Sequence, residues 1–171
     1  PGVTLLEESL CKWFARKIGF NDSSGGITAS GGTLSNLNAL IAARHNAGLG
    51  SDPNSVLIVS EDAHTSFIKC TKIMGLNERN LVRIKTDNNG RMDIENLKKT
   101  LDRCSIENKK IFAIVATLGT TIRGAIDPIK DISEICNERN IWLHVDGSIG
   151  GIFAITSIPI EGLNGLNKAN S

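Results

Sequence analysis

Four short stretches of the chain carry side chains that could bind or activate a small molecule. They are TASGGTLSN at 28–36, SEDAHTS at 60–66, ATLGTTIRGAID at 116–127 and HVDGS at 144–148. A glycine-rich turn that opens a helix favours an anion, and a histidine can stack on a ring or move a proton. Threonine hydroxyls form hydrogen bonds, and a buried acid needs a polar or cationic partner. Together, these groups suit a ligand with a phosphate, a flat ring and a basic ring nitrogen.

Each stretch taken alone also has a simpler interpretation. The turn at 28–36 could only cap a helix, and it lacks the glycine patterns of nucleotide-binding loops. His64 could be a capping or solvent-facing residue, and the hydroxyls of 116–127 could only form a turn. Asp146 could cap the next segment or form a salt bridge to a nearby Lys or Arg. We expect His144 to be a packed or hydrogen-bonded core residue.

Composition and charge limit the kinds of molecule that the protein is expected to bind. A chain of 171 residues is predicted to form one domain with a sizeable core. Its formal net charge of +1 favours neither nucleic acid nor a membrane surface. Its longest apolar runs, such as IFAIVA at 111–116, are far shorter than a membrane span. No signal-peptide pattern opens the sequence. We therefore expect a small molecule as the partner.

The cysteines give an expectation about metals and location. They are widely separated and include no C-x-x-C pair, so neither a disulfide framework nor a metal site is expected. Reduced, partly buried thiols are typical of a cytoplasmic protein. The four residues are Cys11, Cys70, Cys104 and Cys136.

Hydrophobic spacing predicts helices and strands that alternate along the chain. Helices are expected at 4–18, 33–47, 64–76, 93–104 and 129–140. Strands are expected at 56–60, 81–87, 111–117 and 141–146, with a short extended piece at 27–29. This alternation predicts an α/β domain with a mainly parallel sheet, and the continuously apolar strands imply helices on both faces. In such sheets, ligands bind beyond the carboxyl ends of the strands, where three of the four stretches begin.

The order and spacing of these stretches resemble the pyridoxal-phosphate-dependent amino-acid decarboxylases of group II, the glutamate and aromatic-amino-acid decarboxylase family. The resemblance covers nearly the whole chain and is most specific over 116–151. It implies that residues 1–171 are part of the large, cofactor-binding domain of a fold-type I enzyme, which has the architecture of aspartate aminotransferase. The small C-terminal domain of that family is expected to be absent, and the parent protein is expected to be a homodimer.

The resemblance also implies a role for each site residue. His64 would stack over the pyridine ring and Asp146 would pair with the ring nitrogen, so both are expected to be catalytic. A carboxylate there stabilises the protonated ring, which makes the cofactor a stronger electron sink. The glycine-rich run after Asp146 would bring the backbone close to the cofactor. The implied cofactor-binding set is Gly32 and Thr33 at the phosphate, His64, Thr121, Asp146 and Ser148.

The sequence departs from the family pattern in two places. Family members attach the cofactor to a lysine farther downstream than the 25 residues that follow Asp146. Lys168 lies upstream of that position, so we expect it to be a surface lysine and the 171 residues alone to be inactive. Aromatic-specific members carry D-A-A-[YW] where this chain has DGSI at 146–149, so aromatic specificity is not implied. Another fold-type I lyase, or a non-catalytic module for binding or dimerisation, stays open as an alternative.

Overall fold

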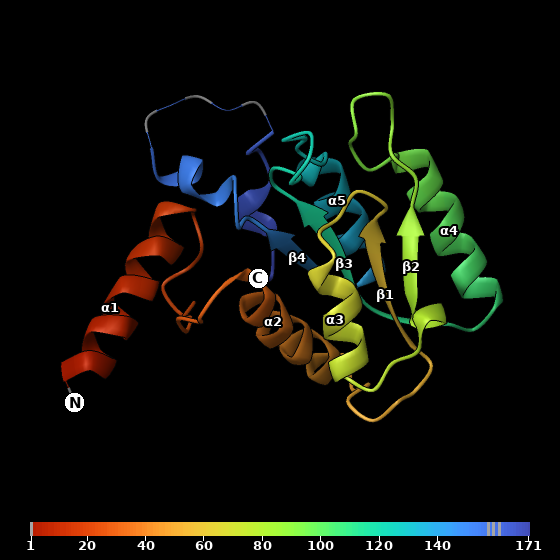
Figure 1. Cartoon of the computed structure of the whole chain (residues 1–171), viewed down its shortest axis with the longest axis horizontal. Helices are drawn as coiled ribbons and strands as arrows, with labels where there is room; N and C mark the ends of the chain where they lie inside the picture. The colour runs from red at the N-terminus through yellow and green to blue at the C-terminus, as the bar shows by residue number, and fades with distance from the viewer. Residues whose placement is uncertain (1, 157, 159, 161) are drawn as a thin grey trace.

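A four-stranded parallel sheet forms the centre of the domain (Figure 1). The computed structural model describes every residue except 1, 157, 159 and 161. The strands lie in the order β2-β1-β3-β4 and all neighbours pair in parallel, which confirms the α/β prediction. The strands are β1 (Ser55–Ser60), β2 (Leu81–Ile84), β3 (Lys110–Thr117) and β4 (Trp142–Asp146). The helices are α1 (Gly2–Lys17), α2 (Gly32–Asn46), α3 (Ser66–Ile73), α4 (Ile94–Ile106) and α5 (Ile129–Arg139).

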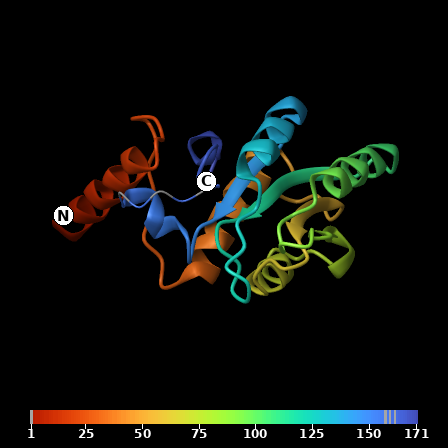
Figure 2. The same cartoon turned by 90° about the horizontal axis from the view of Figure 1, so that it is seen from above.

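Helices cover both faces of the sheet, as the continuously apolar strands predict. Successive side chains of β1 point to opposite faces. Leu57 and Val59 pack with residues of α2 and α3, whereas Val56 and Ile58 pack with residues of α4 and α5. Seen from above, the two pairs of helices lie on opposite sides of the sheet (Figure 2). The core is therefore divided into two apolar layers, with the buried strands between them.

Glycines end three of the helices at the positions that the sequence predicts. Gly19, Gly48 and Gly75 have φ values of 87°, 69° and 72°, in the left-handed region that glycine adopts without a steric penalty. At the other end of a helix, the side chain of Asp93 accepts a hydrogen bond from the N–H of Asn96 and caps α4, as expected.

One predicted extended segment is absent and another is shorter than predicted, because side chains replace the strand partners. No strand forms at 27–29, since the N–H and the hydroxyl of Thr28 both donate to Oε1 of Glu7, at 2.7 Å each. Similarly, β2 stops at Ile84, and the N–H of Thr86 donates to Oε1 of Glu61 at 2.8 Å. Both backbone donors are thus satisfied without a neighbouring strand.

Helix α1 lies beside the sheet rather than on it (Figure 1). It contacts the 3-10 segment η2 (Gly151–Ile155), and only Ala15 among its residues is buried. The weakly patterned end of the chain adds a further short turn, η3 (Leu166–Lys168), and η1 (Glu78–Asn80) precedes β2. Several large apolar side chains of α1 are exposed, namely Val3, Leu5, Leu6, Leu10, Trp13 and Phe14. Within the described residues, no helix is both long and apolar enough to cross a membrane.

Candidate functional site

A cavity of about 310 Å³ lies where β1, β3 and β4 end and where α2 and α3 begin. The direction of strand order changes between β1 and β3, which is where open parallel sheets bind their ligands. All six residues predicted as the site line this one cavity: Gly32, Thr33, His64, Thr121, Asp146 and Ser148. Four residues that the sequence prediction did not include also line it: Asn36, Thr117, Gly119 and Ile149.

The N-terminus of α2 presents backbone N–H groups at one wall of the cavity. Gly31 precedes the helix with a φ of 132°, which only glycine adopts readily, and no side chain caps the first turn. The N–H groups of Leu34 and Ser35 donate to the carbonyl oxygen of Gly31, whereas those of Gly32 and Thr33 have no partner among the described residues and favour an anion. A Cβ atom on Gly32 would lie 2.6 Å from Oγ of Ser148. The absence of a side chain at Gly32 therefore allows the exit of β4 to approach the helix.

His64 stands between β1 and α3 with its ring held from one side. The N–H of Ser66, the first residue of α3, donates to its Nδ1 at 3.1 Å. The side chain is otherwise exposed and lines the cavity. The predicted helix at 64–76 therefore begins two residues late, because His64 lies before the helix and bonds to its first turn. This arrangement leaves Nε2 available to a ligand.

The structure separates the roles of the three threonines in the loop after β3. The hydroxyl of Thr120 is buried and accepts a hydrogen bond from the N–H of Ala125 at 3.0 Å, so Thr120 holds the turn. Thr121 is exposed at the cavity. Thr117 also lines the cavity, and its Oγ1 is buried without a hydrogen-bond partner among the described residues. A polar ligand in the cavity could satisfy that oxygen.

Asp146, at the end of β4, is a buried carboxylate held by two donors. It is 5% exposed; its Oδ1 accepts from the N–H of Ser148 at 3.1 Å, and its Oδ2 accepts from Nδ2 of Asn36 at 3.0 Å. The bond to Ser148 is the local turn role that the sequence left open. In the part of the chain that the structure describes, no Lys or Arg forms an ion pair with Asp146. A buried anion without a cation favours a positively charged ligand group.

His144 and Asn36 form the layer behind Asp146. His144 is 6% exposed, and its Nε2 lies 3.0 Å from Oδ1 of Asn36. Burial lowers the pKa of its imidazole to about 4 and outweighs the opposing effect of the Asp146 charge. His144 is therefore a hydrogen-bonded core residue, as predicted. The sequence prediction missed Asn36, although it lies one helical turn after Gly32 and Thr33 and so shares their face of α2.

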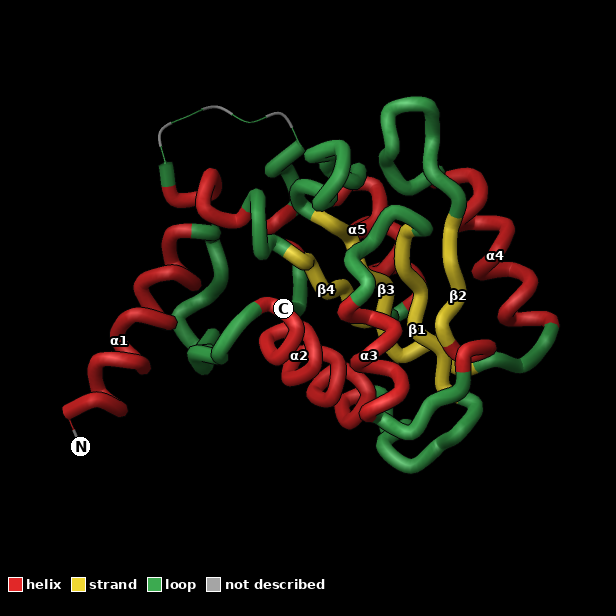
Figure 3. The backbone as a smooth tube through the Cα atoms, viewed as in Figure 1, coloured by secondary structure: helices red, strands yellow, loops and turns green. Residues whose placement is uncertain are grey.

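The glycine-rich run after Asp146 lines the cavity in part and also packs against the loop that follows β3. Ser148 and Ile149 line the cavity, but Gly147, Gly150 and Gly151 do not. The loops that leave β3 and β4 lie side by side (Figure 3), and the N–H of Gly150 donates to the carbonyl oxygen of Leu118 at 2.9 Å. A Cβ atom on Gly150 would overlap that carbonyl. This glycine thus permits close packing of two backbone segments.

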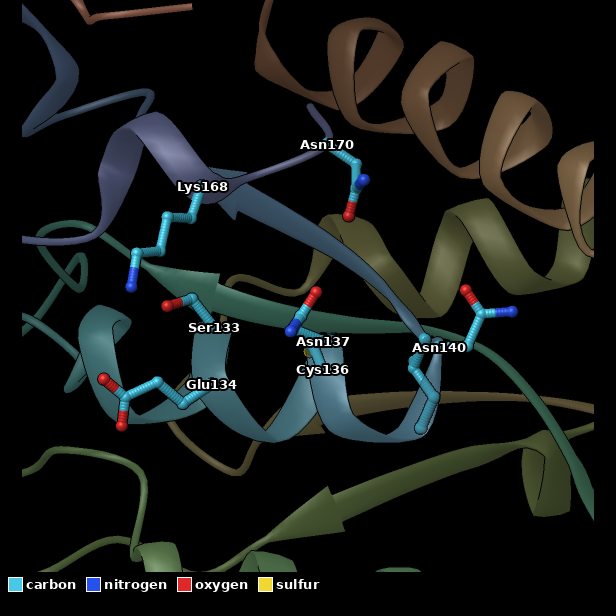
Figure 4. A pocket seen from close by; sticks show the side chains of 8 residues that line it. Ser133, Glu134, Cys136, Asn137, Asn140, Lys168 and Asn170 are labelled. Atoms are coloured by element: carbon cyan, nitrogen blue, oxygen red, sulfur yellow. The ribbon is translucent and has the colours of Figure 1, made fainter.

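Lys168 lies outside this cavity, as predicted for a surface lysine. Its side chain is exposed and lines a separate pocket with residues of α5, among them Ser133, Glu134 and Cys136 (Figure 4). Burial raises the pKa of the Cys136 thiol to about 12, so that thiol is not a reactive group at neutral pH. Because Lys168 lines this separate pocket, it does not belong to the candidate site around Asp146.

A parallel α/β sheet that combines an open helix N-terminus, a histidine and a buried carboxylate at its strand ends defines a domain for a phosphorylated ring cofactor. The chain belongs to the pyridoxal-dependent decarboxylase family, whose conserved domain matches residues 1–171.

Curated relatives and solved structures agree with this assignment. The chain is 34% identical to an aromatic-L-amino-acid decarboxylase of Bacillus atrophaeus over 171 residues, and 34% identical to an acidic amino acid decarboxylase of Xenopus tropicalis over 178 residues. These matches cover 99% and 100% of this chain but 35% of each relative. The apo crystal structure of mouse CSAD superposes with a TM-score of 0.91 at 31% identity, over 97% of this chain and 36% of that one. The chain thus spans about a third of the length of these proteins.

The residues of the cavity fit pyridoxal phosphate. The free N–H groups of α2 suit its phosphate. The buried carboxylate of Asp146, which has no ion-pair partner among the described residues, suits a protonated ring nitrogen. The unpaired Oγ1 of Thr117 suits a polar substituent of the ring. The phosphate, the ring nitrogen and one polar substituent of the cofactor therefore each have a counterpart in the cavity.

Proposed function

We propose that residues 1–171 form the cofactor-binding part of the large domain of an enzyme that decarboxylates an L-amino acid to its amine and CO₂. The observation that carries this proposal is that Asp146 is buried in the same cavity as His64 and the open end of α2, with no cation beside it in the part of the chain that the structure describes. When bound, pyridoxal phosphate is an electron sink for the electron pair left on the substrate α-carbon as CO₂ departs.

Each of the residues that line the cavity would have a defined role in holding the cofactor. The N–H groups around Gly32 and the hydroxyl of Thr33 hold the phosphate. His64 covers one face of the ring, and its Nδ1 bond to Ser66 keeps the imidazole in place. Asp146 keeps the ring nitrogen protonated, because a carboxylate at hydrogen-bond distance favours the charged form. Two further side chains that line the cavity, Thr121 and Ser148, would contact the cofactor.

The substrate is proposed only as an L-amino acid. The two curated relatives are equally similar to this chain, yet one is named for aromatic substrates and the other for acidic ones. Overall identity therefore does not choose between these classes. A cytoplasmic location and a homodimer belong to the same proposal. The free thiols of the four cysteines and the exposed apolar side chains of α1 support them.

Cofactor binding tests the central step. The chain is titrated with pyridoxal phosphate, and the dissociation constant is measured by equilibrium dialysis. We expect saturable binding that Asp146→Asn weakens at least tenfold, about 1.4 kcal/mol, because the charge that faces the ring nitrogen is lost. The matched control is Asp131→Asn, which changes an exposed acid on α5 outside the cavity and should leave binding unaltered. Equal binding by wild type and Asp146→Asn would contradict the proposal.

Product analysis tests the reaction class. The complete gene product is incubated with individual L-amino acids, and amine and CO₂ are quantified. Decarboxylation yields both in equal amounts. A keto acid and ammonia in their place would indicate another type of lyase. Bound cofactor without turnover of any amino acid would indicate a non-catalytic relative.

A further inference from the structure

Asn36 connects two buried groups that are far apart in the sequence. Its side chain is 3% exposed and contacts His144 and Asp146 on β4, each at 3.0 Å, through its two ends. The third contact of its amide is weaker, 3.3 Å to Oγ of Ser66. The side chain of Asn36 therefore connects α2, the helix that carries the proposed phosphate site, to β4 and to the first residue of α3.

The chemistry of the partners fixes the direction of each hydrogen bond. An ionised carboxylate only accepts, so the Nδ2 end of Asn36 must face Asp146 and the Oδ1 end must face His144. A carbonyl oxygen only accepts as well, so Nε2 of His144 must carry a proton. The low pKa of His144 keeps the ring neutral, so its Nδ1 has no proton at neutral pH.

The chain of bonds continues beyond His144 to Ser171. Oγ of Ser171 lies 2.9 Å from Nδ1 of His144, and because that nitrogen only accepts, the hydroxyl must donate. The same oxygen accepts from Nε1 of Trp142 at 2.8 Å. Every bond from Trp142 through Ser171, His144 and Asn36 therefore points toward Asp146.

This one-way chain has a consequence for the carboxylate. Hydrogen bonds in series polarise one another, which strengthens the last donor in a buried setting. That donor holds Oδ2 of Asp146, and the N–H of Ser148 holds Oδ1. With one donor on each oxygen, the rotation of the carboxylate is fixed. Each oxygen keeps a lone pair that a ring nitrogen in the cavity can use.

We propose that Asn36 is a positioning residue that orients Asp146 toward the cofactor ring nitrogen and that keeps the ring proton of His144 on Nε2. This inference rests on the proposed function, since it assigns the ligand of Asp146. Asn36 touches neither substrate nor reacting atoms in this role; it acts through Asp146.

The first test reads the hydrogen bonds without any cofactor. A long-range proton–nitrogen NMR spectrum of the wild-type histidine rings should show His144 with a protonated Nε2 and a bare Nδ1. Asn36→Ala should remove this single tautomer and give a mixture. Asn80→Ala is the control, because Asn80 is an equally buried asparagine whose amide bonds to Pro53 and Ser55 outside the cavity. A mixture in wild type, or no change in Asn36→Ala, would overturn the inference.

The second test uses two cofactor probes. Asn36→Ala should weaken pyridoxal phosphate binding about tenfold, or about 1.4 kcal/mol. It should leave unchanged the binding of the carbocyclic analogue in which C–H replaces the ring nitrogen. Equal losses for both probes would show a merely structural role and reject the proposal. Ser171→Ala, at the partly exposed end of the chain, carries the test if Asn36→Ala does not fold. It should lower affinity about threefold for pyridoxal phosphate only.

The experiments distinguish failure of the proposed function from failure of the positioning role of Asn36. If wild type shows the expected His144 tautomer but binds no pyridoxal phosphate, the proposed function is wrong and the positioning role falls with it. The chain of hydrogen bonds would still stand. If wild type binds pyridoxal phosphate and discriminates against the analogue, but Asn36→Ala does so equally well, only the role of Asn36 is wrong.

Discussion

The carboxylate of Asp127 accepts a hydrogen bond of 2.7 Å from the N–H of Thr117, at the point where β3 ends. Its other oxygen accepts from the N–H of Met92 at 2.6 Å. Asp127 is fully buried, and it ties the loop that carries Thr121 to the turn before α4. Asp127 thereby stabilises the loop that forms one wall of the proposed site.

Asp127 should make stability depend on pH in an unusual direction. Burial raises the pKa of its carboxyl from 3.8 to about 6, and the nearby charges of Asp62 and Asp87 add to this, against the two backbone donors. Because the folded pKa lies above the unfolded one, the contribution is fully present below pH 3.8 and is lost as pH rises through about 6. The loss is on the order of 3 kcal/mol.

This effect is measured by urea unfolding of wild type and Asp127→Asn at pH values from about 3.5 to about 7.5, a range that includes both pKa values. The wild type should lose stability relative to the variant between pH 4 and 6, about the window set by the two pKa values. The comparison is needed because carboxyls with lowered pKa, such as those of Glu61 and Asp87, change stability in the opposite sense. Parallel curves for the two proteins would contradict the assignment.

Gly150→Ala should destabilise the fold because a Cβ atom there would overlap the carbonyl of Leu118. Backbone on both sides leaves little room for adjustment, so we expect a loss of about 1–3 kcal/mol in the free energy of unfolding. Gly151→Ala is the matched control, since no atom of the described residues lies within 4 Å of a Cβ atom at Gly151. Equal stability of the two variants in urea titrations would show that the packing of these loops is not tight.

No lysine within residues 1–171 should become a specific covalent attachment point for the cofactor. None of the residues that line the cavity is a lysine, and Lys168 lines a different pocket. Borohydride reduction with pyridoxal phosphate, followed by peptide mass spectrometry, should show only scattered modification of surface lysines. Lys168→Ala should give the same pattern. One equivalent of label on a single lysine of this chain would overturn the prediction.

Much of the fold and the placement of the site follow from sequence pattern, for a physical reason. Parallel strands end at one edge of their sheet, so the residues after VLIVS, IFAIVAT and IWLHV must come together there. That rule places His64, Thr121 and Asp146 in one region without any knowledge of side-chain contacts. Helix ends at Gly19, Gly48 and Gly75 follow equally from the backbone freedom of glycine.

The parts that sequence did not predict depend on contacts between distant segments. The bond from Asn36 to Asp146 joins residues 110 positions apart, and no local pattern marks it. The choice between Thr120 and Thr121 depends on a turn that buries one hydroxyl and exposes the other. Likewise, the absence of a strand at 27–29 depends on the side chain of Glu7 on α1, which accepts hydrogen bonds from Thr28 in the loop before α2.

The ring of His64 should contribute to cofactor affinity through its shape rather than its charge. A flat ring over the pyridine gains about 0.5–1.5 kcal/mol beyond burial, which corresponds to roughly two- to tenfold in affinity. We therefore expect His64→Ala to weaken pyridoxal phosphate binding within that range, and His64→Phe to keep most of the wild-type affinity. Equilibrium dialysis with both variants makes the measurement, and His45→Ala on α2, outside the cavity, is the control. If His64→Phe binds as weakly as His64→Ala, the imidazole nitrogen and not the ring face makes the contact.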